Sequence, residues 1–427
     1  MRTIFILSFL IHSILIHAQN QPIEGNWKGF LEFGGNKMDI QISFEKEDDG
    51  WTGSLSSQKQ QLDKLIITNI NKELQKLQFD VPLAGGRWSG TINGDSLKGK
   101  WLQAGHAIPL DFVRTDKKAT VEVQYRKQTP RAPFPYEIRE IDYYNEKDQT
   151  KLAGTLTIPK GDGPFPAAIL LSVAGPNDRD QTFGSPQHKP FLVLADYLTK
   201  NGIVVLRSDD RGVGASGGNL YESTLHDFAL DAQAAFNLLK KLPEIDSMKI
   251  GFIGNSEGTL VGPLATSYGC NSAFIITLGG IGIHGSEVIL DQVESIGDLT
   301  SISEEEMEKM KKGTQKMFSL FDQERDREVI KQKLKSMLEK NDSNASKELF
   351  LLPQSIDQQA ELFSSPWYRY QVQHDAGKVL QQITCPFLAL HGNRDPFVSA
   401  DKNLKAIADN LSIAGNQDYT VRKFNNI

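Results

Sequence analysis

The sequence has little cysteine and little net charge. Its 427 residues include only two cysteines, Cys270 and Cys385, and carry a formal net charge of −6. The small acidic charge, with no basic face, argues against a nucleic-acid partner. The cysteines flank no histidine cluster, which argues against a zinc site. Each precedes a predicted parallel strand, so they could pair in an oxidising compartment, although two buried free thiols are the simpler interpretation.

Long apolar runs are also scarce, and the exception is at the start of the chain. Arg2 precedes an apolar run over 4–16, and the small residue Ala18 stands just before Gln19. This layout predicts a secretory signal peptide over 1–18. The run is shorter than the roughly 20 residues that a spanning helix needs, and no cysteine follows it to carry a lipid. We therefore expect export to the periplasm or the exterior of a bacterial cell, without stable membrane insertion.

Residues 22–115 predict a small all-β domain. Short alternating segments are separated by turn signals such as "GGN", "DDG" and "NGD", a spacing typical of a small barrel or sandwich. The Asn-Gly pair within 91–101 indicates a tight hairpin. No catalytic pattern is visible here, so we favour a packed accessory module over a ligand-binding barrel. Residues 116–135, charged and then punctuated by prolines, predict a linker.

From residue 136 the pattern changes to alternating strands and helices. The apolar run 165–175 indicates a strand that is buried on both faces, and 190–202 predicts an amphipathic helix that ends at a glycine. The alternation predicts an α/β domain over 136–427, with a mostly parallel sheet covered by helices. Residues 283–382 contain amphipathic helical segments between two late strands, and we expect this insert to form a lid over a pocket.

The segment "GFIGNSEGTL" carries a Gly-x-Ser-x-Gly motif around Ser256. Alone the motif is weak, but here it follows an apolar strand and precedes a helix, which is the context of a nucleophile elbow. In such a turn, side chains at Gly254 and Gly258 would collide with neighbouring backbone. The positive end of the following helix would lie beneath the serine, and the amide of Glu257 would face a developing oxyanion. An ordinary structural serine is the alternative.

Three further motifs follow predicted strands: "SVAGPNDRD" (172–180), "SDDRGVGASGG" (208–218) and "LALHGNRDPFV" (388–398). Together with the serine motif, they resemble the α/β-hydrolase superfamily. Within it, the chain resembles the secreted bacterial esterases of the esterase-D type, which also carry a small β domain before the hydrolase. The resemblance covers about 136–427, and it is more specific for the fold and the nucleophile than for the substrate.

The resemblance implies a role for four residues. Ser256 would be the nucleophile, and Asp395 the acid that orients the base. The amides of Glu257 and Ala174 would form the oxyanion hole. A solvated loop aspartate is the alternative for Asp395.

Other polar and aromatic residues near these motifs have more modest expected roles. We expect Asp210, Arg211 and the charged residues of 178–180 to pin loops by ion pairs. Three aromatic residues of the insert are expected to line or cover the pocket, with plain packing as the alternative: Trp367, Tyr368 and Tyr370.

The expected base is missing from its usual place. The order in this fold is serine, acid, histidine, but no histidine follows His391, which itself precedes Asp395. We favour a chain truncated after a strand predicted over 418–427. Recruitment of His188, His284 or His391 and a pseudoenzyme that binds without turnover are the alternatives. Losing the histidine costs a serine protease on the order of a million-fold, so we expect the polypeptide as written to hydrolyse esters poorly.

The sequence therefore predicts an exported serine hydrolase that cleaves a small-molecule carboxylic ester through an acyl-serine intermediate. No metal or organic cofactor is expected. A serine peptidase of the same superfamily and a ligand-binding pseudoenzyme remain the alternatives. The acyl length and the oligomeric state stay open.

Overall fold

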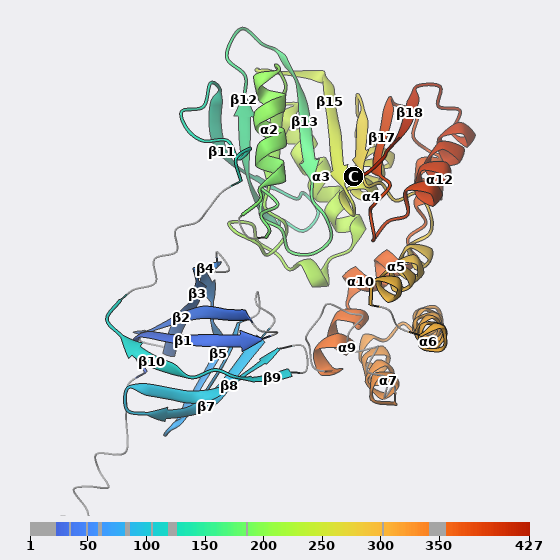
Figure 1. The fold of residues 1–427 in the computed structure, drawn as a ribbon. Coiled ribbons are helices and arrows are strands. Elements are labelled where there is room, and N and C mark those ends of the chain that lie inside the picture. Colours follow the sequence, from blue (N-terminus) through green and yellow to red (C-terminus); the bar gives the residue numbers. More distant parts are fainter. Residues whose placement is uncertain are drawn as a thin grey trace, which may run out of the picture. The chain divides into compact units, whose positions relative to one another are not determined.

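The computed structural model describes ten stretches of the chain: 23–33, 36–47, 50–58, 62–81, 86–103, 106–117, 126–184, 187–300, 303–340 and 356–427. The predicted signal peptide and residues 118–125 of the predicted linker lie outside them. The chain forms two compact units (Figure 1), one within Met1–Arg126 and the other, apart from two short segments, from Lys127 to Ile427.

The first unit is an antiparallel, barrel-like sheet, as predicted. Its strands run in the order β4-β3-β2-β1-β10-β8-β7-β6-β5, and β9 pairs with β8. Their bounds are β1 Gly25–Phe33, β2 Asn36–Glu47, β3 Gly50–Ser57, β4 Leu62–Ile66, β5 Thr68–Glu73, β6 Lys76–Val81, β7 Gly86–Asn93, β8 Ser96–Gln103, β9 His106–Pro109 and β10 Phe112–Thr115.

Alternate residues of these strands fill the interior with aromatic rings. Phe79 and Trp88 stack at a centroid distance of 5.4 Å, and both are fully buried. The indole N–H of Trp88 donates to the carbonyl of Leu110 at 2.8 Å, so its one polar atom is satisfied. The indole also fills the space above Gly99, where an added Cβ would lie 2.5 Å from the ring. This interior is a packed core.

The second unit contains an eight-stranded sheet in the order β11-β12-β14-β13-β15-β16-β17-β18. All strand pairs from β14 to β18 are parallel, and only the pairs that involve β12 are antiparallel. This is the α/β-hydrolase fold, so the predicted fold class is confirmed. The bounds are β11 Glu137–Tyr144, β12 Lys151–Ile158, β13 Phe165–Leu171, β14 Val204–Ser208, β15 Ile245–Asn255, β16 Ile275–Leu278, β17 Phe387–Gly392 and β18 Tyr419–Phe424.

Helices cover both faces of this sheet (Figure 1). One face packs α3 (Leu225–Leu239), α4 (Gly258–Ser267) and α12 (Ala400–Ile413). The other face packs α2 (Pro190–Lys200). Because both faces are covered, the central strands are buried on both sides, and β14 reads as four consecutive buried residues. That burial explains the continuous apolar runs in the sequence.

A helical insert separates β16 from β17. Its described helices are α5 Gly285–Thr300, α6 Glu304–Gln323, α7 Arg327–Lys340, α9 Ile356–Ser364 and α10 Pro366–Gln373, and the short α11 (Ala376–Leu380) leads back to the sheet. The insert is fastened to the loop after β14. Arg327 of α7 forms an ion pair of 2.7 Å with Glu222, in the 3-10 helix η2 (Leu220–Glu222).

Candidate active site

Ser256 occupies a strained turn between β15 and α4. Its φ is +49°, in the left-handed region that a residue with a side chain enters at a cost of about 1–3 kcal/mol. Neighbouring groups hold the turn in place. The amide of Ser256 donates to the carbonyl of Leu278 at 3.0 Å, and the carbonyl of Ser256 accepts from the Thr259 hydroxyl at 2.5 Å. The serine therefore has the elbow backbone that the motif predicts, and its side chain is half-buried.

The two glycines of the motif are required by close backbone approaches. A Cβ at Gly254 would lie 2.2 Å from the carbonyl oxygen of Gly258. A Cβ at Gly258 would lie 2.2 Å from the carbonyl oxygen of Leu171, at the end of β13. Real Cβ contacts are not this short, so the elbow forms only with glycine at both positions. These are the collisions that the sequence motif predicts.

The loop after β13 lies directly against the elbow. The amide of Gly258 donates to the carbonyl of Ser172 at 2.9 Å. The amides of Glu257 and Ala174, the two predicted oxyanion donors, have no acceptor among the described residues. Glu257 immediately precedes α4, so its N–H lies at the positive end of a helix dipole. Both amides are thus available for an oxyanion.

The half-buried Asp210 ties this loop to the end of β14. Asp210 accepts from the Ser172 hydroxyl at 2.5 Å and from the Asn177 amide at 2.9 Å. Burial raises the pKa of Asp210 to about 7, against the lowering effect of these hydrogen bonds. We predicted that Asp210 pins a loop by an ion pair. Asp210 does hold the loop, but the prediction of an ion pair is wrong, because the hydrogen-bond partners of Asp210 are neutral.

Arg211, Arg179 and Asp180 form ion pairs, as predicted. For Asp178 the predicted ion pair is wrong, because its carboxylate accepts from backbone amides instead. Arg211 pairs with Asp231 at 2.6 Å and with Asp148 at 2.7 Å. Arg179 pairs with Asp209 at 2.6 Å. These pairs lock the loops that follow β13 and β14 onto α3 and onto each other.

The side chain of Glu257 was not predicted to have a role. It is only 6% exposed, and its Oε1 accepts from the indole N–H of Trp367 at 2.9 Å. The same oxygen accepts from the side-chain amide of Gln371. Burial raises the pKa of Glu257 to about 8, and the nearby Asp210 carboxyl acts in the same direction. The only hint in the sequence is a lone acidic residue among small and apolar neighbours.

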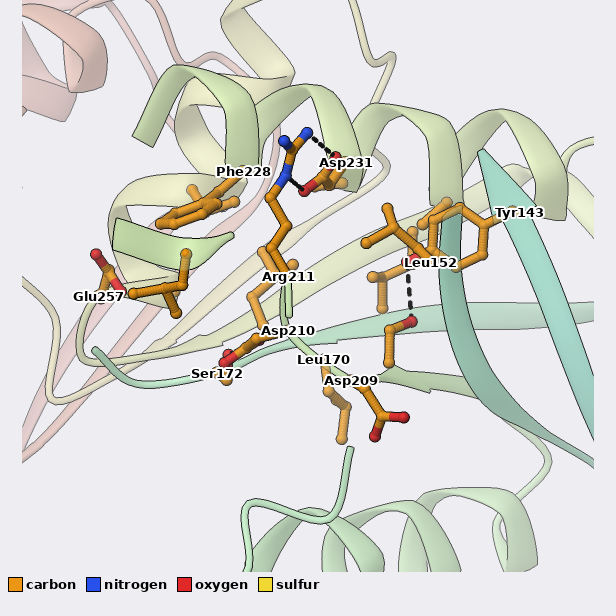
Figure 2. Close-up of a pocket in the computed structure, with 18 residues that line it drawn as sticks. Tyr143, Leu152, Leu170, Ser172, Asp209, Asp210, Arg211, Phe228, Asp231 and Glu257 are labelled. Carbon is orange, nitrogen blue, oxygen red and sulfur yellow. Dashed lines mark hydrogen bonds and ion pairs between the residues drawn. The ribbon is translucent and has the colours of Figure 1, made fainter. Parts of the chain in front are cut away.

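A cavity of about 80 Å³ lies beside these groups (Figure 2). Glu257, Ser172 and Asp210 line one part of it, and the Arg211–Asp231 pair lies along its wall. Apolar side chains supply much of the remaining lining, among them Leu152, Ile169, Leu220, Phe228 and Val261.

The three aromatic residues of α10 do not line this cavity. Trp367 lies above Glu257 and meets Tyr221 edge to face at 5.7 Å. Tyr368 is buried inside the insert, with its ring 4.9 Å from that of Phe363. The predicted lining role is therefore wrong for Tyr368, which has the packing role. Tyr370 packs against the main core of the unit.

Asp395 lies in the loop after β17. Its Oδ1 accepts from the amides of Phe397 at 2.9 Å and Val398 at 3.0 Å, and its Oδ2 lies 3.4 Å from Nε2 of His391. Burial alone would raise the pKa of Asp395, but hydrogen bonds from His391 and from the two amides outweigh it and lower the pKa. Oδ2 also lies close to Gly279, where an added Cβ would be 3.4 Å away. Gly279 follows Leu278, whose carbonyl holds the Ser256 amide.

None of the three histidines considered as a substitute base is bonded to Ser256 in the structure. His391 is fully buried, and its Nε2 lies 2.9 Å from the carbonyl of Val398. Nδ1 of His284 lies 2.8 Å from the Ser286 hydroxyl. His188 forms an isolated bridge with Phe183. These contacts give no support to recruitment.

Cys270 and Cys385 are free thiols, the first buried and the second half-buried. Across the described stretches, no group of three or more His, Cys, Asp or Glu residues could hold a metal ion. None of the helices in those stretches combines the length and apolar character that crossing a bilayer requires.

Comparisons with known proteins agree with these observations. Residues 117–267 match the family model of FrsA-like esterases; this segment contains the elbow and both neighbouring loops. The chain is 31% identical over 155 residues to the esterase EstD of Thermotoga maritima, an alignment that covers 36% of this chain and 37% of that protein. The chain thus spans little more than a third of this curated relative.

The matches to solved structures are more distant in sequence. The Pyrococcus furiosus esterase Pf2001 is 19% identical, with a TM-score of 0.42, and the match covers 68% of this chain and 82% of that one. The α/β hydrolase GrgF from Penicillium sp. sh18 is 16% identical, with a TM-score of 0.43, over 68% of this chain and 90% of that one.

Proposed function

We propose that this α/β hydrolase, which resembles FrsA-like esterases over 117–267, hydrolyses small carboxylic esters through an acyl-serine intermediate. The observation that carries the proposal is the elbow at Ser256, with its φ of +49°. A strained serine is retained where its hydroxyl must be presented at the end of a strand. The Ser256 oxygen would attack the ester carbonyl, the alcohol would leave, and water would then release the acid.

The surroundings of Ser256 suit the charges that develop in this reaction. The unpaired amides of Glu257 and Ala174 would donate to the oxyanion of the tetrahedral intermediate. Asp395, whose pKa is lowered, would be ionised at neutral pH and could orient a protonated imidazole. No described histidine is bonded to Ser256, so we expect the polypeptide as written to turn over slowly. We expect an added histidine base to restore the rate.

Two further parts of the proposal concern access and location. The helical insert would act as a lid, because Trp367 and Gln371 of α10 contact the residue next to Ser256. The leader-like pattern over 1–18 supports export to the periplasm or the exterior.

The test compares the parent chain with Ser256→Ala. We expect a fluorophosphonate probe to label the parent weakly and the variant not at all. In a chain supplied with a histidine base, Ser256→Ala should lower p-nitrophenyl acetate hydrolysis by at least about a thousandfold. Ser412→Ala, at an exposed position on α12, is the matched control and should behave as the parent.

Equal labelling of the parent and Ser256→Ala would overturn the proposal. Faster cleavage of aminoacyl nitroanilides than of p-nitrophenyl esters would favour a peptidase. Loss of labelling in a chain supplied with a histidine base would favour a binding protein.

A further inference from the structure

We propose that Glu257 is a positioning residue whose carboxyl group ties helix α10 of the insert to the amide that holds the oxyanion. The inference rests on the proposed function, because it concerns how that site is assembled. It gives the Glu257 side chain a role separate from that of its backbone N–H.

The geometry places one oxygen of Glu257 where two segments meet, the elbow and α10. Oε1 of Glu257 accepts from Trp367 at 2.9 Å and also from Gln371. The two donors lie one turn apart on α10, and they lie 110 and 114 residues away from Glu257 along the chain. A single acceptor therefore fixes both the height and the rotation of this helix above the elbow.

The backbone of Glu257 has little freedom to move independently. On one side, the Ser256 amide is bonded to the carbonyl of Leu278 at 3.0 Å. On the other, the Gly258 amide is bonded to the carbonyl of Ser172 at 2.9 Å. A shift of α10 would therefore pull, through the carboxyl group, on the peptide unit that presents the oxyanion donor.

Burying a carboxyl group at position 257 is unfavourable in free energy. Burying one without a cation costs free energy that an apolar side chain of similar size would not. Among the described residues that line the adjoining cavity, Arg211 is the only cation, and it is engaged by Asp231 and Asp148. The nearby carboxyl group of Asp210 disfavours a negative charge on Glu257. The cost is offset by directed hydrogen bonds, which an apolar side chain cannot make.

The role predicts a particular pattern of kinetic effects. Glu257→Met removes the acceptor but keeps a side chain of similar length, so kcat should fall by about tenfold to a hundredfold with little change in KM. Glu257→Gln keeps a carbonyl oxygen that accepts both bonds, and it should recover most of that loss. Gln371→Met should cost less than Glu257→Met, because the Trp367 bond survives.

A matched control is available on the same helix. The side-chain amide of Gln373 donates to the carbonyl of Phe321 at 3.4 Å, within the insert and away from Glu257. Gln373→Met should leave kcat and KM at the parent values. Thermal unfolding of each variant should show a cooperative transition, which confirms that the variant is folded.

The fluorescence of Trp367 tests the contact between Glu257 and α10, and this measurement does not depend on catalytic turnover. Of the five tryptophans in the chain, Trp367 is the only one after residue 101, so subtracting the emission of Trp367→Phe from that of the parent isolates its fluorescence. We expect Glu257→Met to shift this difference spectrum, and Glu257→Gln to restore it towards the parent spectrum.

The outcomes separate this inference from the proposed function. If Ser256→Ala is inactive while Glu257→Met keeps the parent kcat and Trp367 emission, the positioning role is wrong and the esterase proposal stands. If Glu257→Gln is as impaired as Glu257→Met, the hydrogen-bond account is overturned. If Ser256→Ala keeps the parent activity, the esterase proposal fails, and the emission shift alone decides whether the tie exists.

Discussion

Carboxyl groups on the two sides of the elbow have pKa values that are shifted in opposite directions. We call the side of Asp395 the acid side, and the side of Glu257 and Asp210 the oxyanion side. On the acid side, Asp395 keeps 27% of its side chain exposed and accepts from two backbone amides, and its pKa is lowered. On the oxyanion side, Glu257 is buried and Asp210 is half-buried, and desolvation raises their pKa values to about 8 and about 7. The chemical group is the same, but its depth and its donors decide the protonation state.

The difference matches the charges that an acyl-transfer site has to handle. A negative charge on Asp395 would stabilise an imidazolium that forms beside it. A negative charge on Glu257 or Asp210 would lie close to the developing oxyanion and oppose it. In the proposed site, Asp395 would therefore supply charge on one side of the elbow, and a protonated Glu257 would supply hydrogen bonding without charge on the other. Each prediction below alters one side.

The largest expected effect comes from removing the charge on the acid side. Asp395→Asn keeps an oxygen that can accept from the amides of Phe397 and Val398, so the loop should stay folded. The ability to stabilise an imidazolium is lost, and kcat for p-nitrophenyl acetate should fall by about three to four orders of magnitude in a chain with its histidine base. Asp409→Asn, at an exposed position on α12, is the control. If Asp395→Asn kept the kcat of the parent, Asp395 would be a solvated loop aspartate without a catalytic role.

A smaller loss is expected when the oxyanion side loses its loop anchor. Asp210→Ala leaves the Ser172 hydroxyl and the Asn177 amide without their acceptor, at a cost of about 1–3 kcal/mol for each group that stays buried. The loop that carries Ala174 should loosen, and kcat should fall by about a hundredfold. Urea unfolding and steady-state kinetics measure the two effects. An unchanged free energy of unfolding would show that water replaces the carboxyl group.

The two sides of the elbow also differ in how much of their structure could be predicted from the sequence. The elbow was predictable because its constraints are local: Gly254 and Gly258 must be small for steric reasons, and the strand and helix around Ser256 have clear periodicity. The place of Asp395 in a loop was predictable, because an apolar strand precedes it in the motif; its catalytic role stays a prediction. The alternation of apolar strands and amphipathic helices was likewise enough for the fold.

The oxyanion side was harder to predict because its contacts are long-range. The carboxyl of Glu257 meets Trp367 and Gln371 across 110 and 114 residues, and only the packing of the insert brings them together. The neutral partners of Asp210 could not be told from cationic ones, since arginines lie on both sides of it in the motifs. For Tyr368 the sequence left lining and packing open, because it does not show which residues of the insert face one another; the structure gives the packing role.

The pH dependence of the free energy of unfolding should reveal the raised pKa of Glu257 on the oxyanion side. The folded pKa of Glu257, about 8, lies above its ordinary value of 4.5, so the native state binds more protons than the unfolded chain between these values. The free energy of unfolding should therefore fall as pH rises through this range, by up to about 1.4 kcal/mol per pH unit. Glu257→Gln should flatten the slope. A slope that is the same in parent and variant would contradict a protonated Glu257.

The acid side should show the reverse slope, and a smaller one, because Asp395 is partly exposed and solvent screens its interactions. Its folded pKa lies below the ordinary value of 3.8, so its ionised form contributes stability that is present above that value and is lost as pH falls through the folded pKa. Asp395→Asn should reduce the acid-limb slope in urea unfolding below about pH 4, and Asp409→Asn should not match this reduction. If Asp395→Asn left the acid limb unchanged while Glu257→Gln flattened the neutral one, the amides of Phe397 and Val398 would orient the carboxylate without favouring its charge.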